Sequence, residues 1–329
     1  MRFLIVKLSS LGDVVHTMPV VHDLRAAHPG ALVDWVVDPA FAPLVRRVDG
    51  VNQVIECAIR RWRRAWWTSS TRAECRTFRE RLQRERYDAV IDLQGLTKSA
   101  VVARLARGLR FGLANRTEGS SYEAPAAWLV DHAIRVEPHI HAMDRSRSLV
   151  AQVLARPAEG PPVYGLRANP PARPATQPTV AFVHGTSRDD KLWPQSNWVN
   201  LGKRVIGAGW RIGLPQGNEA EQTRAEMIAA GLQYEGSLRV DVWPSVGLDA
   251  VLDRLAATRG VIGVDSGLSH LAVALDLPHV QLYNKPTAWR TGPQPAHGHR
   301  HQVALEASPA PTLESVWSAW NGVLRAASA

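Results

Sequence analysis

Short apolar runs alternate with helically periodic segments from the first residues onward. Residues 3–6 form an apolar, β-branched run with the length of a buried strand, and a small polar turn at residues 9–12 follows it, immediately before Asp13. Apolar residues then recur at helical spacing over residues 14–24, where Pro19 must lie at a helix start or kink the helix. The opening therefore predicts a strand, a tight loop and a helix, with Asp13 at the mouth of the strand.

The same alternation continues along the chain and restarts after a proline-rich stretch. We predict further strands at residues 32–37, 88–94, 179–183, 211–214, 260–265 and 279–283, and helices at residues 97–105, 198–208, 219–232, 252–257, 268–275 and 313–324. Strands that alternate with helices imply parallel, doubly wound sheets.

This pattern predicts an α/β protein of two Rossmann-like domains whose parallel sheets face a central cleft. Four prolines within residues 167–178 mark the linker. The first domain is then residues 1–166 and the second residues 179–311. We expect the terminal helix, at about residues 312–327, to pack back on the first domain.

Length and composition are those of an ordinary globular protein. The 329 residues exceed what one hydrophobic core usually supports, and 45% of them are apolar and 21% charged. No apolar stretch approaches the roughly 18 residues that span a bilayer, and the N-terminus lacks the layout of a cleaved signal, so we expect no export. Cys57 and Cys75 lack the CxxC spacing of a zinc site, which favours a reducing compartment.

The positive charge lies mainly in the first half of the chain. Net charge is +9, and residues 1–160 hold 24 Lys and Arg against 17 Asp and Glu, whereas the remainder holds 15 against 13. Such a field attracts nucleic acid, anionic lipid or a phosphorylated substrate.

A phosphate-binding turn is predicted where the strand at residues 260–265 ends. Asp265 closes the strand, and Ser266 and Gly267 open the following helix, which carries His270. Free amides at a helix N-terminus, with the positive end of the helix dipole behind them, form an anion site suited to a diphosphate. The alternative is that Asp265 or Ser266 only caps the helix.

A second candidate lies in the polar loop that follows the strand at residues 179–183. This loop offers the Thr186 and Ser187 hydroxyls and the Lys191 ammonium to diphosphate oxygens, and Lys191 would neutralise charge as a leaving group departs. The alternative is a solvated loop in which Asp189 pairs with Lys191. A metal at Asp189 and Asp190 is disfavoured, because adjacent side chains diverge and the chain contains no Asp-x-Asp.

Two acidic residues begin the predicted helix at residues 219–232. Either Glu219 or Glu221 is placed to bond ribose hydroxyls just past a strand end. Acidic residues are also common in a first helical turn because they complement the helix dipole.

An arginine- and tryptophan-rich segment occupies residues 60–67. Its members are Arg60, Arg61, Trp62, Arg63, Arg64, Trp66 and Trp67. Arginine matches phosphate and carboxylate geometry, and tryptophan suits a boundary between water and an apolar phase, so the segment fits an anionic lipid head group. Nucleic-acid binding with tryptophan stacking is one alternative, and a solvated helix face is another.

Asp13 is the leading candidate for a catalytic base. A carboxylate beside Ser9, Ser10 and Gly12 at a strand mouth is positioned to take a proton from a bound hydroxyl. The alternative is that Asp13 only caps the first helix. Residues 9–13 hold one glycine where a dinucleotide fingerprint needs three, so a dehydrogenase is disfavoured.

Four motifs, in this order along nearly the whole chain, together resemble glycosyltransferase family 9. They are Lys7-Leu8-Ser9-Ser10-Leu11-Gly12-Asp13-Val14-Val15-His16-Thr17-Met18-Pro19, Asp92-Leu93-Gln94-Gly95, His184-Gly185-Thr186-Ser187-Arg188-Asp189-Asp190-Lys191-Leu192-Trp193-Pro194 and Asp265-Ser266-Gly267-Leu268-Ser269-His270.

The resemblance implies a GT-B fold and inverting, metal-independent transfer of L-glycero-D-manno-heptose from ADP-heptose to the first Kdo of Kdo2-lipid A, with ADP-heptose as a co-substrate and no cofactor. It also implies lipopolysaccharide inner-core synthesis by a monomer at the cytoplasmic face of the inner membrane, without nucleic acid. Family members that add the second heptose share the opening motif but usually lack Ser-Ser before Leu-Gly-Asp and the Arg-Asp-Asp-Lys loop. A transferase of this fold that uses another ADP- or UDP-sugar is a further alternative.

The resemblance also implies roles for individual residues. Asp13 matches the general base, and Lys191 matches the diphosphate-binding lysine. The donor set is Thr186, Ser187, Lys191, Glu221, Asp265, Ser266, Gly267, Leu268 and His270, with Ser266 at a position where many relatives have Thr. The acceptor set is Lys7, Ser10, Gly12, Arg60, Arg61, Arg63, Arg64 and His139.

Overall fold

The chain folds as two compact units. In the computed structural model, which describes residues 1–169, 177–232, 239–298 and 300–328, unit 1 is Met1–Arg167 and unit 2 is Ala168–Ala329. The predicted linker, residues 167–178, lies largely outside the described residues.

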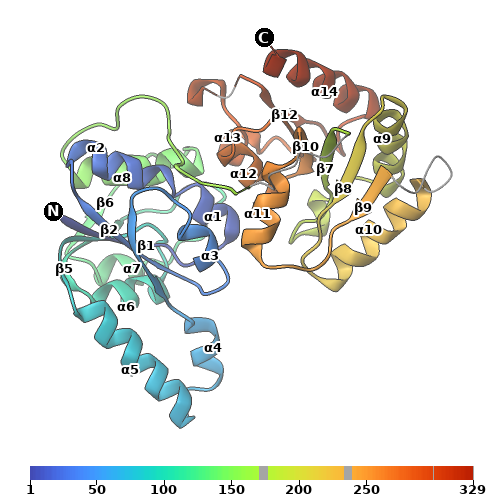
Figure 1. Ribbon diagram of the computed structural model, residues 1–329. Coiled ribbons are helices and arrows are strands. Elements are labelled where there is room, and N and C mark those ends of the chain that lie inside the picture. The colour runs from blue at the N-terminus through green and yellow to red at the C-terminus, as the bar shows by residue number, and fades with distance from the viewer. Residues whose placement is uncertain (170–176, 233–238, 299, 329) are drawn as a thin grey trace. The chain divides into compact units, whose positions relative to one another are not determined.

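Unit 1 is built on a parallel six-stranded sheet in the order β3-β2-β1-β4-β5-β6 (Figure 1). The strands are β1 (Arg2–Val6), β2 (Leu32–Val37), β3 (Val51–Glu56), β4 (Arg86–Asp92), β5 (Arg107–Leu113) and β6 (His132–Ile134). The helices are α1 (Leu11–Val15), α2 (Pro19–Ala27), α3 (Ala42–Val45), α4 (Ile59–Arg64), α5 (Ser69–Gln83), α6 (Thr97–Leu105), α7 (Pro125–Trp128) and α8 (Ala142–Val153).

Burial on both faces explains why β1 is a nearly continuous apolar run. Leu4 and Val6 pack in one core with Phe78 of α5 and Val102 of α6. Ile5 points to the opposite face and is fully buried there as well. The strand therefore lies at the centre of the sheet, and its carboxyl end opens beside that of β4.

Pro19 begins a new helix, as its position predicts. The chain after β1 forms the short helix α1, and α2 then begins at Pro19 in the first helical position. Proline lacks the amide hydrogen that a helix interior needs but is tolerated at a helix start. The break keeps Asp13 in a one-turn helix at the strand mouth.

Unit 2 repeats this topology, with β9-β8-β7-β10-β11-β12 as the order of its parallel sheet (Figure 1). The strands are β7 (Thr179–Val183), β8 (Arg211–Leu214), β9 (Val240–Val242), β10 (Gly260–Val264), β11 (His279–Tyr283) and β12 (Gln302–Glu306). The helices are the 3₁₀ turns η1 (Asp189–Lys191) and η4 (Pro295–His297), together with α9 (Gln195–Gly207), α10 (Glu219–Leu232), α11 (Leu248–Ala256), α12 (Gly267–Ala274), α13 (Ala288–Thr291) and α14 (Leu313–Ser328).

The terminal helix α14 packs on unit 2, so the expectation that it packs on the first domain is wrong. Val316, Trp320 and Val323 are buried in the core that contains Phe182 of β7 and Trp198 of α9. Their helical spacing made the helix predictable. The partner of that apolar face is set by packing, which periodicity does not encode.

The two doubly wound parallel sheets confirm the predicted α/β architecture. All seven predicted strands are present, with ends shifted by two residues at most. The prediction missed β3, β5, β6, β9 and β12, which are short, near a sheet edge or interrupted by polar residues. In both units the order reverses between two central strands, β1 and β4 or β7 and β10, and ligands of open α/β sheets bind at such switch points.

Candidate active site

The predicted base, Asp13, lies at the switch point of unit 1, on the third residue of α1. Its Oδ2 accepts hydrogen bonds from the Ser10 amide at 3.0 Å and the Ser10 hydroxyl at 2.9 Å. Asp13 is therefore not the residue that begins the helix but the reciprocal member of a capping box. Its other oxygen, Oδ1, faces Lys7 Nζ at 3.4 Å and Arg145 Nη2 at 3.8 Å.

Lys7 lies beneath Asp13. Its side chain is 1% exposed, whereas that of Asp13 is 37% exposed. The ammonium donates to the Leu93 carbonyl at 2.9 Å, just beyond the end of β4. An ammonium buried to this extent needs partners, and Leu93 and Asp13 supply them.

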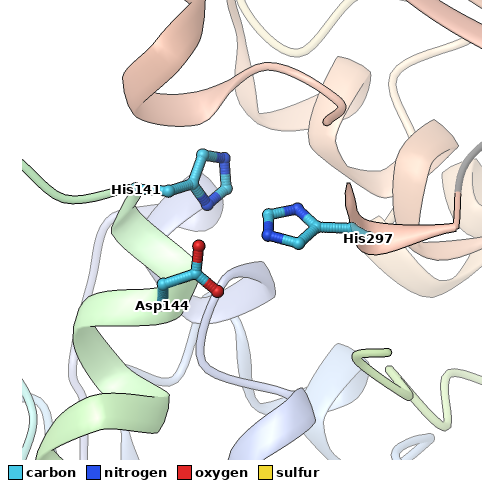
Figure 2. A group of neighbouring side chains, drawn as sticks. All are labelled: His141, Asp144 and His297. Atoms are coloured by element: carbon cyan, nitrogen blue, oxygen red, sulfur yellow. The ribbon is translucent and has the colours of Figure 1, made fainter. Parts of the chain in front are cut away.

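Arg145 approaches Asp13 from α8. It is 5% exposed, and its Nη1 donates to the buried hydroxyl of Thr117 at 3.2 Å. Figure 2 shows the first turn of this helix, with the His141 ring and the Asp144 carboxylate on the same side; the third labelled residue, His297, belongs to η4 of unit 2. His141 caps the helix by accepting from the Met143 amide.

The motif Asp92-Leu93-Gln94-Gly95 holds the loop that carries Asp13. Gln94 Oε1 accepts from the Leu8 and Ser9 amides at 3.0 and 3.2 Å, and Gln94 Nε2 donates to the Ser9 carbonyl at 2.6 Å. Asp92 accepts from the Gln94 amide and the Ser99 hydroxyl. A side-chain amide that pairs with both sides of a backbone segment fixes its position.

These contacts and burial shift the pKa values of Asp13, Lys7 and Asp92. Burial acts to raise the pKa of Asp13, but Lys7, the Ser10 amide and Arg145 outweigh it and lower the pKa to about 2. Burial lowers the pKa of Lys7, which Asp13 opposes. Burial raises the pKa of Asp92 to about 6. Asp13 is therefore a fully ionised carboxylate at neutral pH.

The arginine- and tryptophan-rich segment forms α4 and the turn after it, which protrude with α5 from the rest of unit 1 (Figure 1). Arg60 reaches back to the opening loop and donates to the Ser9 hydroxyl at 3.0 Å. Arg61 forms a bidentate pair with Glu74. Trp66 and Trp67 are 68% and 61% exposed, with their rings edge to face.

Other predicted acceptor residues of unit 1 have local partners. His139 lies at the surface with its Nδ1 2.9 Å from Glu118 Oε2. Gly12 is part of α1, and its carbonyl accepts from the His16 amide. Ser10, whose hydroxyl donates to Asp13, is exposed at the same strand mouth.

At the switch point of unit 2, a buried acid holds a more exposed lysine. Lys191 Nζ lies 2.6 Å from Asp265 Oδ2, and the side chains are 25% and 6% exposed. Asp265 Oδ1 lies 3.4 Å from His270 Nε2. Burial acts to raise the pKa of Asp265, but His270 and Lys191 hold it well below its usual range. The alternative pairing of Lys191 with Asp189 is therefore wrong, and Asp190 instead pairs with Arg188 and Lys285.

Neither residue proposed as a simple cap of α12 performs that role. Ser266 occupies the N-cap position without a side-chain capping hydrogen bond, and Asp265 is turned toward Lys191 and His270. The first amides of α12, from Gly267 onward, have no intrahelical acceptor. Beside them, Thr186 donates to the Asp265 carbonyl at 3.1 Å, which brings the two predicted phosphate loops together. Ser187 is exposed, and Leu268 is partly buried.

Glu221 rather than Glu219 lies against the end of β7. A Cβ at Gly185 would meet the Glu221 carboxyl carbon at 2.7 Å. Glu221 Oε2 accepts from the Gly217 amide at 2.8 Å, whereas Glu219 is exposed. The absence of a side chain at Gly185 admits this carboxylate to the strand mouth.

Sequence reasoning missed several residues of these networks. Gln94 ends one predicted strand and Gly185 follows another, and both lie within the quoted motifs, so their position was a usable signal. Arg145 and Thr291 carried none, because each comes from a segment that had no predicted element. Thr291 lies 3.4 Å from Asp265 Oδ1. No helix within the described ranges is long and apolar enough to cross a bilayer.

Known proteins match nearly the whole chain. The family model described as Glycosyltransferase family 9 (heptosyltransferase) matches residues 75–319. Lipopolysaccharide heptosyltransferase 1 of Escherichia coli strain K12 is 42% identical over 289 residues, which cover 86% of this chain and 88% of that protein. Lipopolysaccharide heptosyltransferase 2 of the same strain is 27% identical over 303 residues, covering 86% and 82%.

A solved structure shares the fold. The structure described as E. coli heptosyltransferase WaaC with ADP has a TM-score of 0.86 and 37% sequence identity, and the match covers 98% of this chain and 100% of that one. This likeness confirms the GT-B fold class.

Proposed function

Because this chain belongs to glycosyltransferase family 9 and is a heptosyltransferase, we propose that it transfers L-glycero-D-manno-heptose from ADP-heptose to the first Kdo of Kdo2-lipid A. Two charged groups at the switch points carry the proposal: the Asp13 carboxylate in unit 1 and the Lys191 ammonium in unit 2. The greater identity to heptosyltransferase 1 than to heptosyltransferase 2 supports the first Kdo as the acceptor.

The proposed reaction is a single displacement with inversion. A Kdo hydroxyl oxygen attacks the anomeric carbon of heptose, and the bond from that carbon to the ADP oxygen breaks with its electron pair remaining on the β-phosphate. Asp13 takes the hydroxyl proton. Lys191 and the first amides of α12 stabilise the charge that grows on the diphosphate. Positive charge from these groups serves where other transferases use a divalent cation, so we expect EDTA to leave the rate unchanged.

Other residues supply binding. On the donor side, Glu221 accepts hydrogen bonds from the ribose, and Thr186, Ser187, Ser266, Gly267, Leu268 and His270 border the diphosphate. On the acceptor side, Arg60, Arg63, Arg64 and His139 attract the acidic Kdo and lipid A phosphates. Arg61, held by Glu74, contributes to the same positive field.

Incubation of the protein with ADP-heptose and Kdo2-lipid A tests the proposal. We expect a product heavier by one heptose in the mass spectrum. Kdo2-lipid A that already carries one heptose is the control acceptor, and UDP-glucose is the control donor. Preference for the heptosylated acceptor would assign the second transfer instead, and use of UDP-glucose alone would overturn the donor assignment.

We also propose peripheral contact with the anionic cytoplasmic face of the inner membrane through residues 60–67. Exposed Trp66 and Trp67 suit the lipid interface, and the neighbouring arginines suit its negative charge. The test is sedimentation with vesicles that contain anionic phospholipid. The double variant Trp66→Ala Trp67→Ala should bind several-fold less, whereas Trp128→Ala, which removes an 80% exposed tryptophan elsewhere in unit 1, should bind like the parent.

A further inference from the structure

The two carboxylate oxygens of Asp13 have different neighbours. Oδ2 is committed to Ser10 through two hydrogen bonds of 2.9 and 3.0 Å, which fix the carboxylate on its own helical turn. Oδ1 faces two cations, Lys7 and Arg145, at 3.4 and 3.8 Å. The orientation of the carboxylate is therefore determined from two sides.

Neither cation lies at the surface. Lys7 is 1% exposed and anchored to the Leu93 carbonyl, and Arg145 is 5% exposed and anchored to Thr117. Direct binding of an acceptor sugar would require Lys7 to leave this buried position. Its location behind Asp13 instead suits a group that acts through Asp13.

We propose, on the basis of the proposed function, that Lys7 and Arg145 are positioning residues that hold Asp13 ionised and oriented toward the acceptor hydroxyl. This assigns Lys7 a different role from the acceptor contact expected from the sequence. It also gives a role to the Asp92-Leu93-Gln94-Gly95 motif: its Leu93 carbonyl fixes Lys7, and its Gln94 fixes the backbone before Ser10.

The chemistry of the transfer suits a weakly basic carboxylate. A hydroxyl oxygen becomes strongly acidic once it bonds to the anomeric carbon, so a carboxylate with a pKa of about 2 can accept its proton late in the reaction. The same low pKa returns the proton to water after product forms. Among the described residues, the charged groups that act on Asp13 are Lys7, which directly follows β1, and Arg145 from α8, and Asp92 from β4 acts on Lys7.

Three variants and one matched control test the proposal. Arg145→Met and Lys7→Met each remove one cation, and Arg145→Lys keeps the charge. Arg147→Met is the control, because Arg147 lies on the same helix and forms a buried bidentate pair with Asp23 instead. Thermal unfolding of all four measures the purely structural cost.

For Arg145→Met and Lys7→Met we expect kcat to fall about tenfold with an unchanged KM for ADP-heptose. The pKa of the Asp13 carboxyl should also rise in these two variants, because burial is then opposed by one cation fewer. Arg145→Lys should restore most of both. Arg147→Met should keep the parent kcat and pH profile even if it lowers the melting temperature.

A readout without catalysis keeps this proposal separate from the proposed function. The ¹³C resonance of the Asp13 carboxyl, assigned through Asp13→Asn, should remain at its ionised position at about pH 4 in the parent and shift toward the protonated position in Arg145→Met. An unshifted resonance in Arg145→Met and Lys7→Met would overturn the inference, whether or not the parent transfers heptose. An equal loss of kcat in Arg147→Met would also overturn it, because the effect would then be structural.

Discussion

At the switch point of unit 1 a carboxylate is the more exposed member of an ion pair and the cation is buried. At the switch point of unit 2 the cation is the more exposed member and the carboxylate is buried. The Lys7 side chain is 1% exposed and Asp13 37%, but Asp265 is 6% exposed and Lys191 25%. The two sheets share one strand order, so the difference does not come from topology. It comes from which member of each ion pair is buried.

This reversal matches the two tasks that we propose for Asp13 and Lys191 in the glycosyl transfer. A presented carboxylate suits removal of a proton from a nucleophile, and a presented ammonium suits the diphosphate of a leaving group. In each unit the more exposed charged group forms an ion pair with a more buried group of opposite charge. The same scaffold therefore supports opposite chemistry through exchange of the two charges.

The largest effect is expected from removal of the presented carboxylate. Asp13→Asn keeps the size of the side chain but removes its basicity, so kcat should fall about 10³-fold. ADP-heptose affinity, measured by calorimetry, should stay close to that of the parent, because donor binding is assigned to unit 2. Full turnover in this variant would end the assignment of Asp13 as base.

Removal of the presented cation should have the next largest effect. Lys191→Met should lower kcat/KM for ADP-heptose about 10²-fold, since the charge on the departing diphosphate loses its nearest ammonium. Asp265→Asn is the informative companion, because Lys191 keeps its charge there and loses only its anchor. Steady-state kinetics should place it between the parent and Lys191→Met; a loss greater than that of Lys191→Met would show that Asp265 does more than hold Lys191.

Unit 2 also contains two buried histidines, His184 and His279, whose lowered pKa values make its stability depend on pH. Burial lowers the pKa of both His184 and His279 to about 4 from 6.5. Between pH 6.5 and 4 these histidines are protonated in the unfolded chain but mostly neutral in the folded protein. The free energy of unfolding is therefore unaffected by them above pH 6.5 and decreases as the pH falls toward 4. Each histidine should lower the free energy of unfolding by about 2 kcal/mol between about pH 7.5 and 5.

Urea unfolding at the two pH values measures this loss. His184→Gln and His279→Gln should each weaken the pH dependence, whereas His132→Gln, at an exposed position in unit 1, should retain it. Identical pH dependence in all four proteins would contradict the assignment to the buried rings.

The smallest effect is expected at the surface of unit 1. Replacement of Arg60, Arg61, Arg63 and Arg64 by alanine should raise the KM for Kdo2-lipid A about fivefold or more and leave ADP binding unchanged, because exposed charges contribute modestly and are screened by salt. Arg61→Ala alone should change little, since Glu74 already pairs with it. An unchanged acceptor KM in the fourfold variant would reject the acceptor role of this segment.

Much of this architecture was accessible from the sequence because its signals are local. The apolar run of β1, the proline at the start of α2 and the small residues after β10 each depend on a few neighbouring positions. The prediction therefore placed Asp13 and Asp265 at the ends of strands, where the structure has them. Glu221 could not be separated from Glu219 in this way, because the contact with Gly185 joins distant segments.

The sequence by itself determined the alternation of strands and helices, the repeat of one doubly wound unit and the placement of Asp13, Lys191 and Asp265 at strand mouths. Only the tertiary structure decided that α14 packs on unit 2, that Arg145 reaches Asp13 and that Lys7 is buried while Lys191 is presented. The physical reason is that periodicity follows from neighbours along the chain, whereas desolvation and charge pairing depend on groups that folding brings together.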